Sequence, residues 1–224
     1  GEPSRRSSSW YYPNLPGGVF FVNERTKLFS RTTSIDLSGV KWITSDCAKQ
    51  IGHNCPKLTD IKFNGATILG DQGVIALTES CSKLASIGIE NCMTLTDNSI
   101  VAIAQHCPLL EKIILCGYQF TETSILALAH CCPRLRSGTF DCWKVDEETW
   151  LYLAARCPLV SLAFRDRCPF RNAGVQAIAA TCPDLYSIDV SARSFSMTTL
   201  LDTLPQLRHV TLRNCQTVPN AEFL

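Results

Sequence analysis

Apolar residues along the chain follow two alternating spacings. In one, they recur at positions i, i+3, i+4 and i+7 and so share one face of a helix; Val74, Leu77 and Cys81 form such a stripe. In the other, they alternate with polar residues, as in a strand with one buried face; Ile87 and Ile89 belong to this kind. Since the two spacings succeed each other, the pattern predicts repeated units of one strand and one helix.

A short sequence element marks the end of each predicted helix. It usually reads cysteine, proline, any residue and leucine, and proline cannot continue a helix because it lacks a backbone N–H group. The element recurs at spacings of 26, 26, 25, 25 and 25 residues, and a copy without cysteine begins at Leu204. Its cysteines are Cys55, Cys81, Cys107, Cys132, Cys157 and Cys182. A period this regular predicts a solenoid.

The predicted fold class is α/β, a solenoid curved like a horseshoe with a parallel β-sheet on its concave face and α-helices on its convex face. We expect about seven to eight repeats of 25–26 residues over residues 31–224. Residues 1–30 are expected to form an N-terminal tail that caps the first repeat, since they include Trp10, Tyr11 and Phe20. The C-terminal end is expected to be uncapped, because the chain stops where a further helix is due.

The copy that begins at Cys157 departs from the regular spacing. In strict register Phe164 would face solvent, and a shift of one residue reverses every side chain of a strand. We infer a deletion after Pro158, which brings the apolar residues back to the buried face. The buried set is then Leu159, Leu162 and Phe164, and Arg165 and Asp166 face outward.

The stretch CSKLASIGIENCMTLTD, residues 81–97, resembles the cysteine-containing leucine-rich repeat, whose consensus reads CPxLxxLxLxxCxxLTD before a helix. The resemblance spans about residues 29–218. Three copies hold the second consensus cysteine, as Cys92, Cys168 and Cys215, whereas the others hold Ala66, Tyr118, Trp143 and Arg193. The last three side chains are too large for a small buried position, so we expect an irregular turn in those copies.

The resemblance implies that partners bind the concave sheet, whose outward strand positions the alternation identifies. These candidate binding residues are Asp36, Asp60, Lys62, Lys112, Asp141, Arg165, Asp166, Asp189, His209 and Arg213. Small residues such as Ser86, Gly88, Thr139 and Ala163 lie between them. The predicted surface is polar, mixed in sign and shallow, which favours a protein or peptide partner over a small molecule.

The composition of the chain limits which partners and which cellular compartment are expected. A formal charge of +1 gives no electrostatic case for nucleic acid, and the longest apolar runs are too short for membrane insertion. Thirteen cysteines are an odd number, which argues against a secreted disulfide framework. We therefore expect an intracellular reducing compartment, with the cytoplasm favoured over the mitochondrion.

The sequence holds no GxSxG, HExxH, P-loop or GxGxxG motif, so we expect neither an enzyme nor a cofactor. Closely spaced cysteine or histidine pairs of the CxxC kind are missing, so no metal site is expected either. Cys131 and Cys132 are adjacent, but only Cys132 is in register with the other repeat cysteines. Cys131 is therefore predicted to be the more exposed of the two.

The family resemblance implies a substrate-recognition solenoid like that of F-box proteins, which select substrates for cullin-RING ubiquitin ligases. The 30 residues before Thr32 are too short for an F-box, so this chain is not expected to bind the ligase adaptor itself. The alternative is a subunit of a large ciliary or mitochondrial assembly, docked through the N-terminal aromatic segment and the C-terminal edge. A GTPase activator that presents Arg165 is a third hypothesis.

Overall fold

The computed structural model describes residues 30–165, 169–191 and 197–213. Several features that the sequence singled out lie outside these ranges. They are residues 1–29 of the expected cap, Asp166, Cys168, Arg193, Cys215 and the C-terminal edge of the chain.

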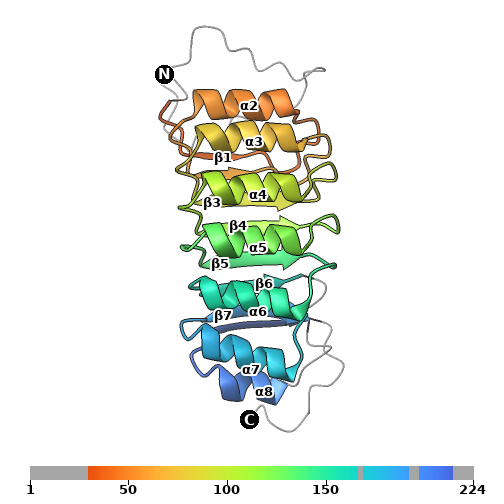
Figure 1. The fold of residues 1–224 in the computed structure, drawn as a ribbon, viewed down its shortest axis with the longest axis vertical. Coiled ribbons are helices and arrows are strands. Elements are labelled where there is room, and N and C mark those ends of the chain that lie inside the picture. Colours follow the sequence, from red (N-terminus) through yellow and green to blue (C-terminus); the bar gives the residue numbers. More distant parts are fainter. Residues whose placement is uncertain (1–29, 166–168, 192–196, 214–224) are drawn as a thin grey trace, which may run out of the picture.

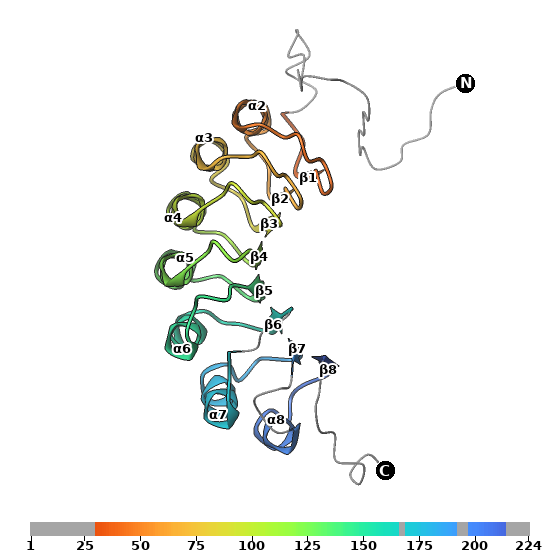
Figure 2. The ribbon, with the colours of Figure 1, turned by 90° about the vertical axis from the view of Figure 1, so that its right-hand side faces the viewer.

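The described residues form eight parallel strands in one sheet, and neighbours in the chain are neighbours in the sheet. The strands are β1 (Ser34–Asp36), β2 (Asp60–Lys62), β3 (Ser86–Glu90), β4 (Lys112–Cys116), β5 (Ser137–Asp141), β6 (Ser161–Phe164), β7 (Ser187–Ser191) and β8 (His209–Arg213). The connecting helices are α2 (Ser45–Asn54), α3 (Asp71–Ser80), α4 (Asp97–His106), α5 (Glu122–Cys131), α6 (Glu147–Arg156), α7 (Asn172–Thr181) and α8 (Met197–Thr203). Figure 1 shows the helices stacked over one face of the sheet, and in Figure 2 the strands follow the inner side of an arc. The predicted solenoid is confirmed.

Equivalent residues of successive repeats lie side by side in the sheet. Ile61 pairs with Ile87, and Ile87 pairs with Ile113. All three side chains are at most 1% exposed and face the helices. A slip of one residue would bring this apolar row to the solvent face, so its burial fixes the register.

The repeat cysteines stack behind the sheet. Each helix from α2 to α7 ends one residue before a repeat cysteine. The thiol of Cys81 lies 3.4 Å from the carbonyl oxygen of Cys55, and the thiol of Cys107 lies 3.8 Å from the carbonyl oxygen of Cys81. Burial raises the pKa of the Cys107 and Cys132 thiols to about 12. These thiols are therefore protonated at neutral pH and act as small packing groups.

The adjacent cysteines differ as predicted, because Cys132 is fully buried and Cys131 is partly exposed at the end of α5. We expect mild alkylation of the folded protein to label Cys131 before Cys132, since the reagent must reach the thiolate. Peptide mass spectrometry after short exposure to iodoacetamide measures the two rates. Equal labelling would contradict the burial of Cys132.

The deletion inferred in the fifth copy is confirmed. Leu159, Leu162 and Phe164 are at most 2% exposed, and Arg165 is partly exposed on the opposite face. The missing residue shortens the turn after α6. There the N–H of Leu159 donates to the carbonyl of Cys157 at 2.8 Å, two residues back, whereas the other repeats span three.

The turn after β5 is also shorter than expected, and the assignment of Trp143 to the second consensus cysteine was wrong. Cys142, directly after β5, takes this position and donates to the carbonyl of Leu115 at 3.5 Å. Cys92 donates in the same way to the carbonyl of Phe63 at 3.1 Å, but lies two residues after β3. Because the turn after β5 is one residue shorter, its small buried side chain comes one residue earlier after the strand.

The turn after β4 follows the same rule. Gly117 takes the small position, and the Gln119 side chain fills the space beside it by donating to the carbonyl of Cys92 at 2.9 Å. Tyr118, which the consensus had placed there, is 59% exposed. The expected irregular turns are thus confirmed after β4 and β5, and their cause is a deletion of one residue.

Four aromatic side chains pack together where β5 and β6 meet α6. The rings of Phe140 and Trp150 lie 4.6 Å apart, and Trp150 meets Phe164 edge-on at 5.0 Å. Phe170 meets Phe164 edge-on at 5.3 Å. Such tilted and edge-on contacts stabilise aromatic pairs beyond the burial of their area. The cluster forms the core of the repeats that carry the shortened turns.

Candidate functional site

Three rows of side chains cover the concave face, because every second residue of a strand points to it. The first row contains Ser34, Asp60, Ser86, Lys112, Ser137, Ser161, Ser187 and His209. The second contains Asp36, Lys62, Gly88, Ile114, Thr139, Ala163, Asp189 and Thr211. The third, at the carboxyl ends of the strands, contains Glu90, Cys116 and Asp141, together with Arg165 and Arg213. Every candidate binding residue except Asp166, which is not described, lies in one of these rows.

An ion pair joins the first two strands. The ammonium group of Lys62 lies 3.1 Å from the carboxylate of Asp36. Partial burial would raise the pKa of Asp36, but hydrogen bonds from Ser38 and the charge of Lys62 outweigh it, so that pKa is lowered. The carboxylate in turn raises the pKa of Lys62. Both groups are therefore charged at neutral pH and offer a partner one site of each sign.

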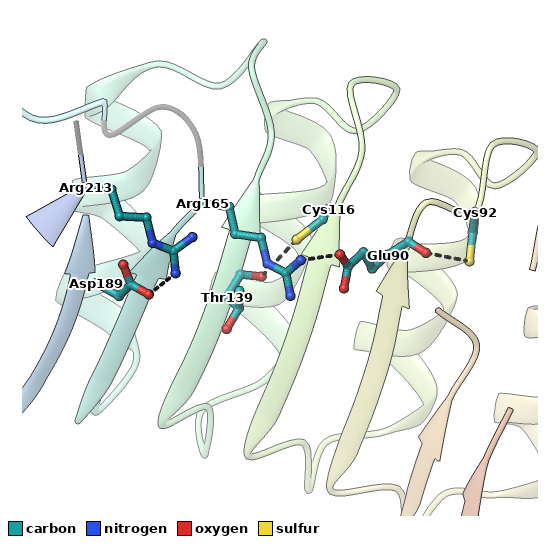
Figure 3. A network of polar contacts seen from close by, with 7 residues as sticks. All are labelled: Glu90, Cys92, Cys116, Thr139, Arg165, Asp189 and Arg213. Atoms are coloured by element: carbon teal, nitrogen blue, oxygen red, sulfur yellow. Dashed lines mark hydrogen bonds and ion pairs between the residues drawn. The ribbon is translucent and has the colours of Figure 1, made fainter. Parts of the chain in front are cut away.

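A second ion pair, at the centre of the face, joins residues that lie three strands apart. Arg165, directly after β6, reaches over β5 and β4 to Glu90 at the end of β3, as Figure 3 shows. Cys116 lies between them, with its thiol directed at the carbonyl of Thr139. The side chains of Arg165 and Glu90 are 38% and 20% exposed, so solvent and a partner can reach both.

The third ion pair joins the last two strands. Arg213 of β8 contacts the carboxylate of Asp189 in β7. In Figure 3 this pair lies to the left of Arg165, on the next strands of the sheet. Together the three pairs place acidic and basic side chains alternately along the face. The face therefore carries both signs of charge along its length.

Removal of the central pair is expected to cost little stability. Exposed ion pairs contribute about 1 kcal/mol or less, since solvent screens them, and Arg165 is more than a third exposed. Arg165→Ala should therefore lower the free energy of unfolding by at most about 1 kcal/mol in a urea titration. A loss of about 3 kcal/mol or more would show that the pair holds the sheet together instead of lying available on it.

Sequence reasoning missed Glu90 and Cys116. The signal was present for Glu90, because it has the same parity as Ser86 and Gly88, which were placed outward. The pairing of Glu90 with Arg165 had no such signal, since 75 residues separate them and the curvature of the sheet decides which residues of a row come into contact.

Two hollows of the described residues lie away from the concave face. One, of about 350 Å³, lies between α3 and α4 and includes Asp71, Asn98 and His106. The other, of about 440 Å³, lies beside the carboxyl ends of α6 and α7. Neither includes a residue of the three rows. The described residues also hold no group of three or more histidine, cysteine or acidic side chains placed to bind a metal. No helix among them is long and apolar enough to cross a membrane.

Comparison with known proteins identifies the fold. No protein-family model matches the chain, and neither does any curated protein sequence. A chain of the Rad7 and Elc1 complex in yeast matches 75% of this chain with a TM-score of 0.62 and 19% identity. The match covers 44% of that chain, so this chain spans less than half of its length. An internalin C2 from Listeria monocytogenes matches with a TM-score of 0.55 and 15% identity, over 84% of each chain. At such identities the likeness shows the fold alone, and the fold is that of leucine-rich-repeat proteins.

Proposed function

We propose that the chain is a non-enzymatic scaffold that binds a protein partner on its concave face. The observation that carries this proposal is the pattern of the three rows. Charged side chains such as Lys62 and Lys112 stand among small ones such as Gly88 and Ala163 on an open sheet, and the two hollows described above include none of them. Small molecules favour enclosed apolar pockets, whereas a broad polar face suits a protein surface.

We propose further that this protein partner is a substrate of a ubiquitin ligase. The resemblance of residues 81–97 to the repeats of F-box proteins supports this role. Affinity purification of the full-length native protein tests it. Recovery of a ligase adaptor or cullin is expected, and purification of other partners without either would overturn the ligase role.

Charge reversal on the concave face tests the scaffold function itself. The variant Lys62→Glu with Lys112→Glu changes the concave face, whereas Lys49→Glu with Lys83→Glu changes the net charge equally outside it. Both would be used as bait in extracts of the cells that produce the protein, with quantitative mass spectrometry. The concave variant should lose at least about nine tenths of the partner signal, since like charges across an interface oppose binding.

The control variant separates specific from general effects. It should retain the partners of the wild type, because it carries the same total charge as the concave variant. Equal loss in both variants, or retention in both, would contradict binding on the concave face.

A further inference from the structure

A line of exposed apolar side chains runs along one edge of the solenoid, in the turns that follow successive strands. Its members recur at intervals of 26, 25, 25 and 25 residues, and the first two lie one residue further along their turns than the last three do. They are Trp42, Ile68, Met93, Tyr118 and Trp143, and we call them the apolar row. In Figure 1 the turns lie on the side to which the strand arrows point.

Exposure sets the apolar row apart from the rest of the described surface. Four large hydrophobic side chains there are more than half exposed, and all four belong to the row: Ile68, Met93, Tyr118 and Trp143. The row also adjoins the concave face, because the Trp143 indole N–H donates to Asp141 at 2.7 Å. Exposed apolar side chains that gather in this way mark interaction sites, whereas scattered ones do not.

The row offers a partner no free strand edge after β2 to β5, since each of these strands is paired on both sides. The N–H of Gly65 donates to the carbonyl of Glu90 at 2.6 Å, and the N–H of Gly117 donates to the carbonyl of Asp141 at 3.1 Å. A partner that adds a strand needs free backbone groups on its receiver. The row therefore suits a segment whose own backbone is satisfied internally, which is an α-helix.

The dimensions agree with a helix laid along the row. Strands of a sheet lie about 4.8 Å apart, so five successive repeats span about 20 Å. A helix rises about 5.4 Å per turn, and about 14 residues cover the same length. One helical turn is about as long as the spacing of the strands, so apolar side chains that recur every three to four residues along such a helix would follow the row from repeat to repeat.

Charge beside the row selects the sign of the partner. The turns lead into α2 to α6, and the first turn of each of these five helices holds at least one acidic residue. The carboxylates are those of Asp46, Asp71, Asp97, Glu122, Asp146, Glu147 and Glu148, and the basic side chains in the same turns are Lys41 and Lys144. The excess of carboxylates favours lysine and arginine on the partner.

We infer that the apolar row is a second docking surface, which binds a basic amphipathic helix of a partner protein. The apolar face of that helix covers Met93, Tyr118 and Trp143, and its basic side chains reach the acidic first turns of the neighbouring helices. This surface lies beside the concave face and extends the contact area beyond the proposed function.

A selection from random peptide sequences tests the inference and does not require the native partner. A displayed library of 18-residue peptides would be selected on the full chain, and enriched peptides would be synthesised and titrated by fluorescence anisotropy. The enriched sequences should have a net positive charge and apolar residues at i, i+3, i+4 and i+7. The variant Tyr118→Ser with Trp143→Ser should weaken their binding at least about tenfold.

The matched control changes two exposed apolar side chains on the opposite flank, Leu109→Ser with Tyr186→Ser, and should bind as the wild type does. Enrichment of acidic peptides, of peptides without helical spacing, or of none would overturn the inference, and so would equal binding by both variants. A native partner lost by the concave variant but kept by the Tyr118 and Trp143 variant would overturn this inference alone and leave the proposed function intact.

Discussion

Replacement of Phe140 by alanine is expected to lower the free energy of unfolding by about 3–5 kcal/mol, the range for large aromatic residues in a core. Phe140 is fully buried and contacts Trp150 and Phe164. Its ring also fills a gap in the sheet, because Gly138 stands where neighbouring strands hold apolar side chains. Urea denaturation followed by circular dichroism measures the loss. A change below about 1 kcal/mol would contradict this packing.

A second substitution checks the same contact from the other side. A Cβ atom on Gly138 would lie 2.1 Å from the Phe140 ring, so Gly138→Ala should destabilise the protein by about 1–3 kcal/mol through overpacking. The cost should largely disappear in a Phe140→Leu background, since the ring is gone. Additive effects of the two changes would show that the residues are not in contact. Tyr118→Ala, at an exposed position, serves as the control.

Replacement of Asp97 by alanine is expected to cost about 2–4 kcal/mol, because it removes several hydrogen bonds to a charged acceptor. The carboxylate accepts hydrogen bonds from the backbone N–H and the hydroxyl of Thr121, at 2.9 and 2.6 Å, and from the buried hydroxyl of Ser124. Thr121 in turn caps α5. Asp97 thus ties the start of one helix to the next repeat, and urea denaturation measures its contribution.

The exposed Asp46 provides the control for Asp97. It lies in the first turn of α2, so Asp46→Ala removes only an interaction with the helix dipole, worth about 0.3–1 kcal/mol. Losses of equal size at the two positions would contradict the contact between repeats.

The contribution of Asp97 should also depend on pH. Burial would raise the pKa of this carboxyl, but hydrogen bonds from Ser124 and Thr121 outweigh it and lower the pKa below the ordinary 3.8. A lowered pKa means that the stabilisation is complete above the unfolded value and is lost as pH falls through the folded one. The difference in stability between the wild type and Asp97→Ala should therefore be constant near neutral pH and shrink below about pH 4. A difference that grows on acidification would contradict the assignment.

The sequence predicted the repeat, its register and the deletion in the fifth copy, because each rests on spacing within a single repeat. Phe164 shows this most clearly, since its burial follows from the alternation of neighbouring residues alone. Cys142 shows where spacing is not enough. The deletion after β5 leaves the strand pattern unchanged, and only the position of the thiol against the carbonyl of Leu115 shows which residue occupies the small position.

The residues of the concave face were predictable in part, because alternation within a single strand decides which side chains point outward. Parity along a strand places Lys62 and Asp189 on the concave face, but contacts across several repeats depend on the curvature of the sheet, so the Glu90–Arg165 pair was missed. The apolar row also had a signal in the sequence. Tyr118 and Trp143 are too large for the buried position, and their exposure is the consequence.

Lysine footprinting of the full chain, alone and with its captured partner, tests most directly whether the concave face binds. Acetylation of each lysine would be quantified by mass spectrometry. Lys62 and Lys112, on the concave rows, should become protected in the complex, while Lys49 on α2 reacts as it does in the free protein. Protection of Lys49 with unchanged labelling of Lys62 and Lys112 would contradict the account.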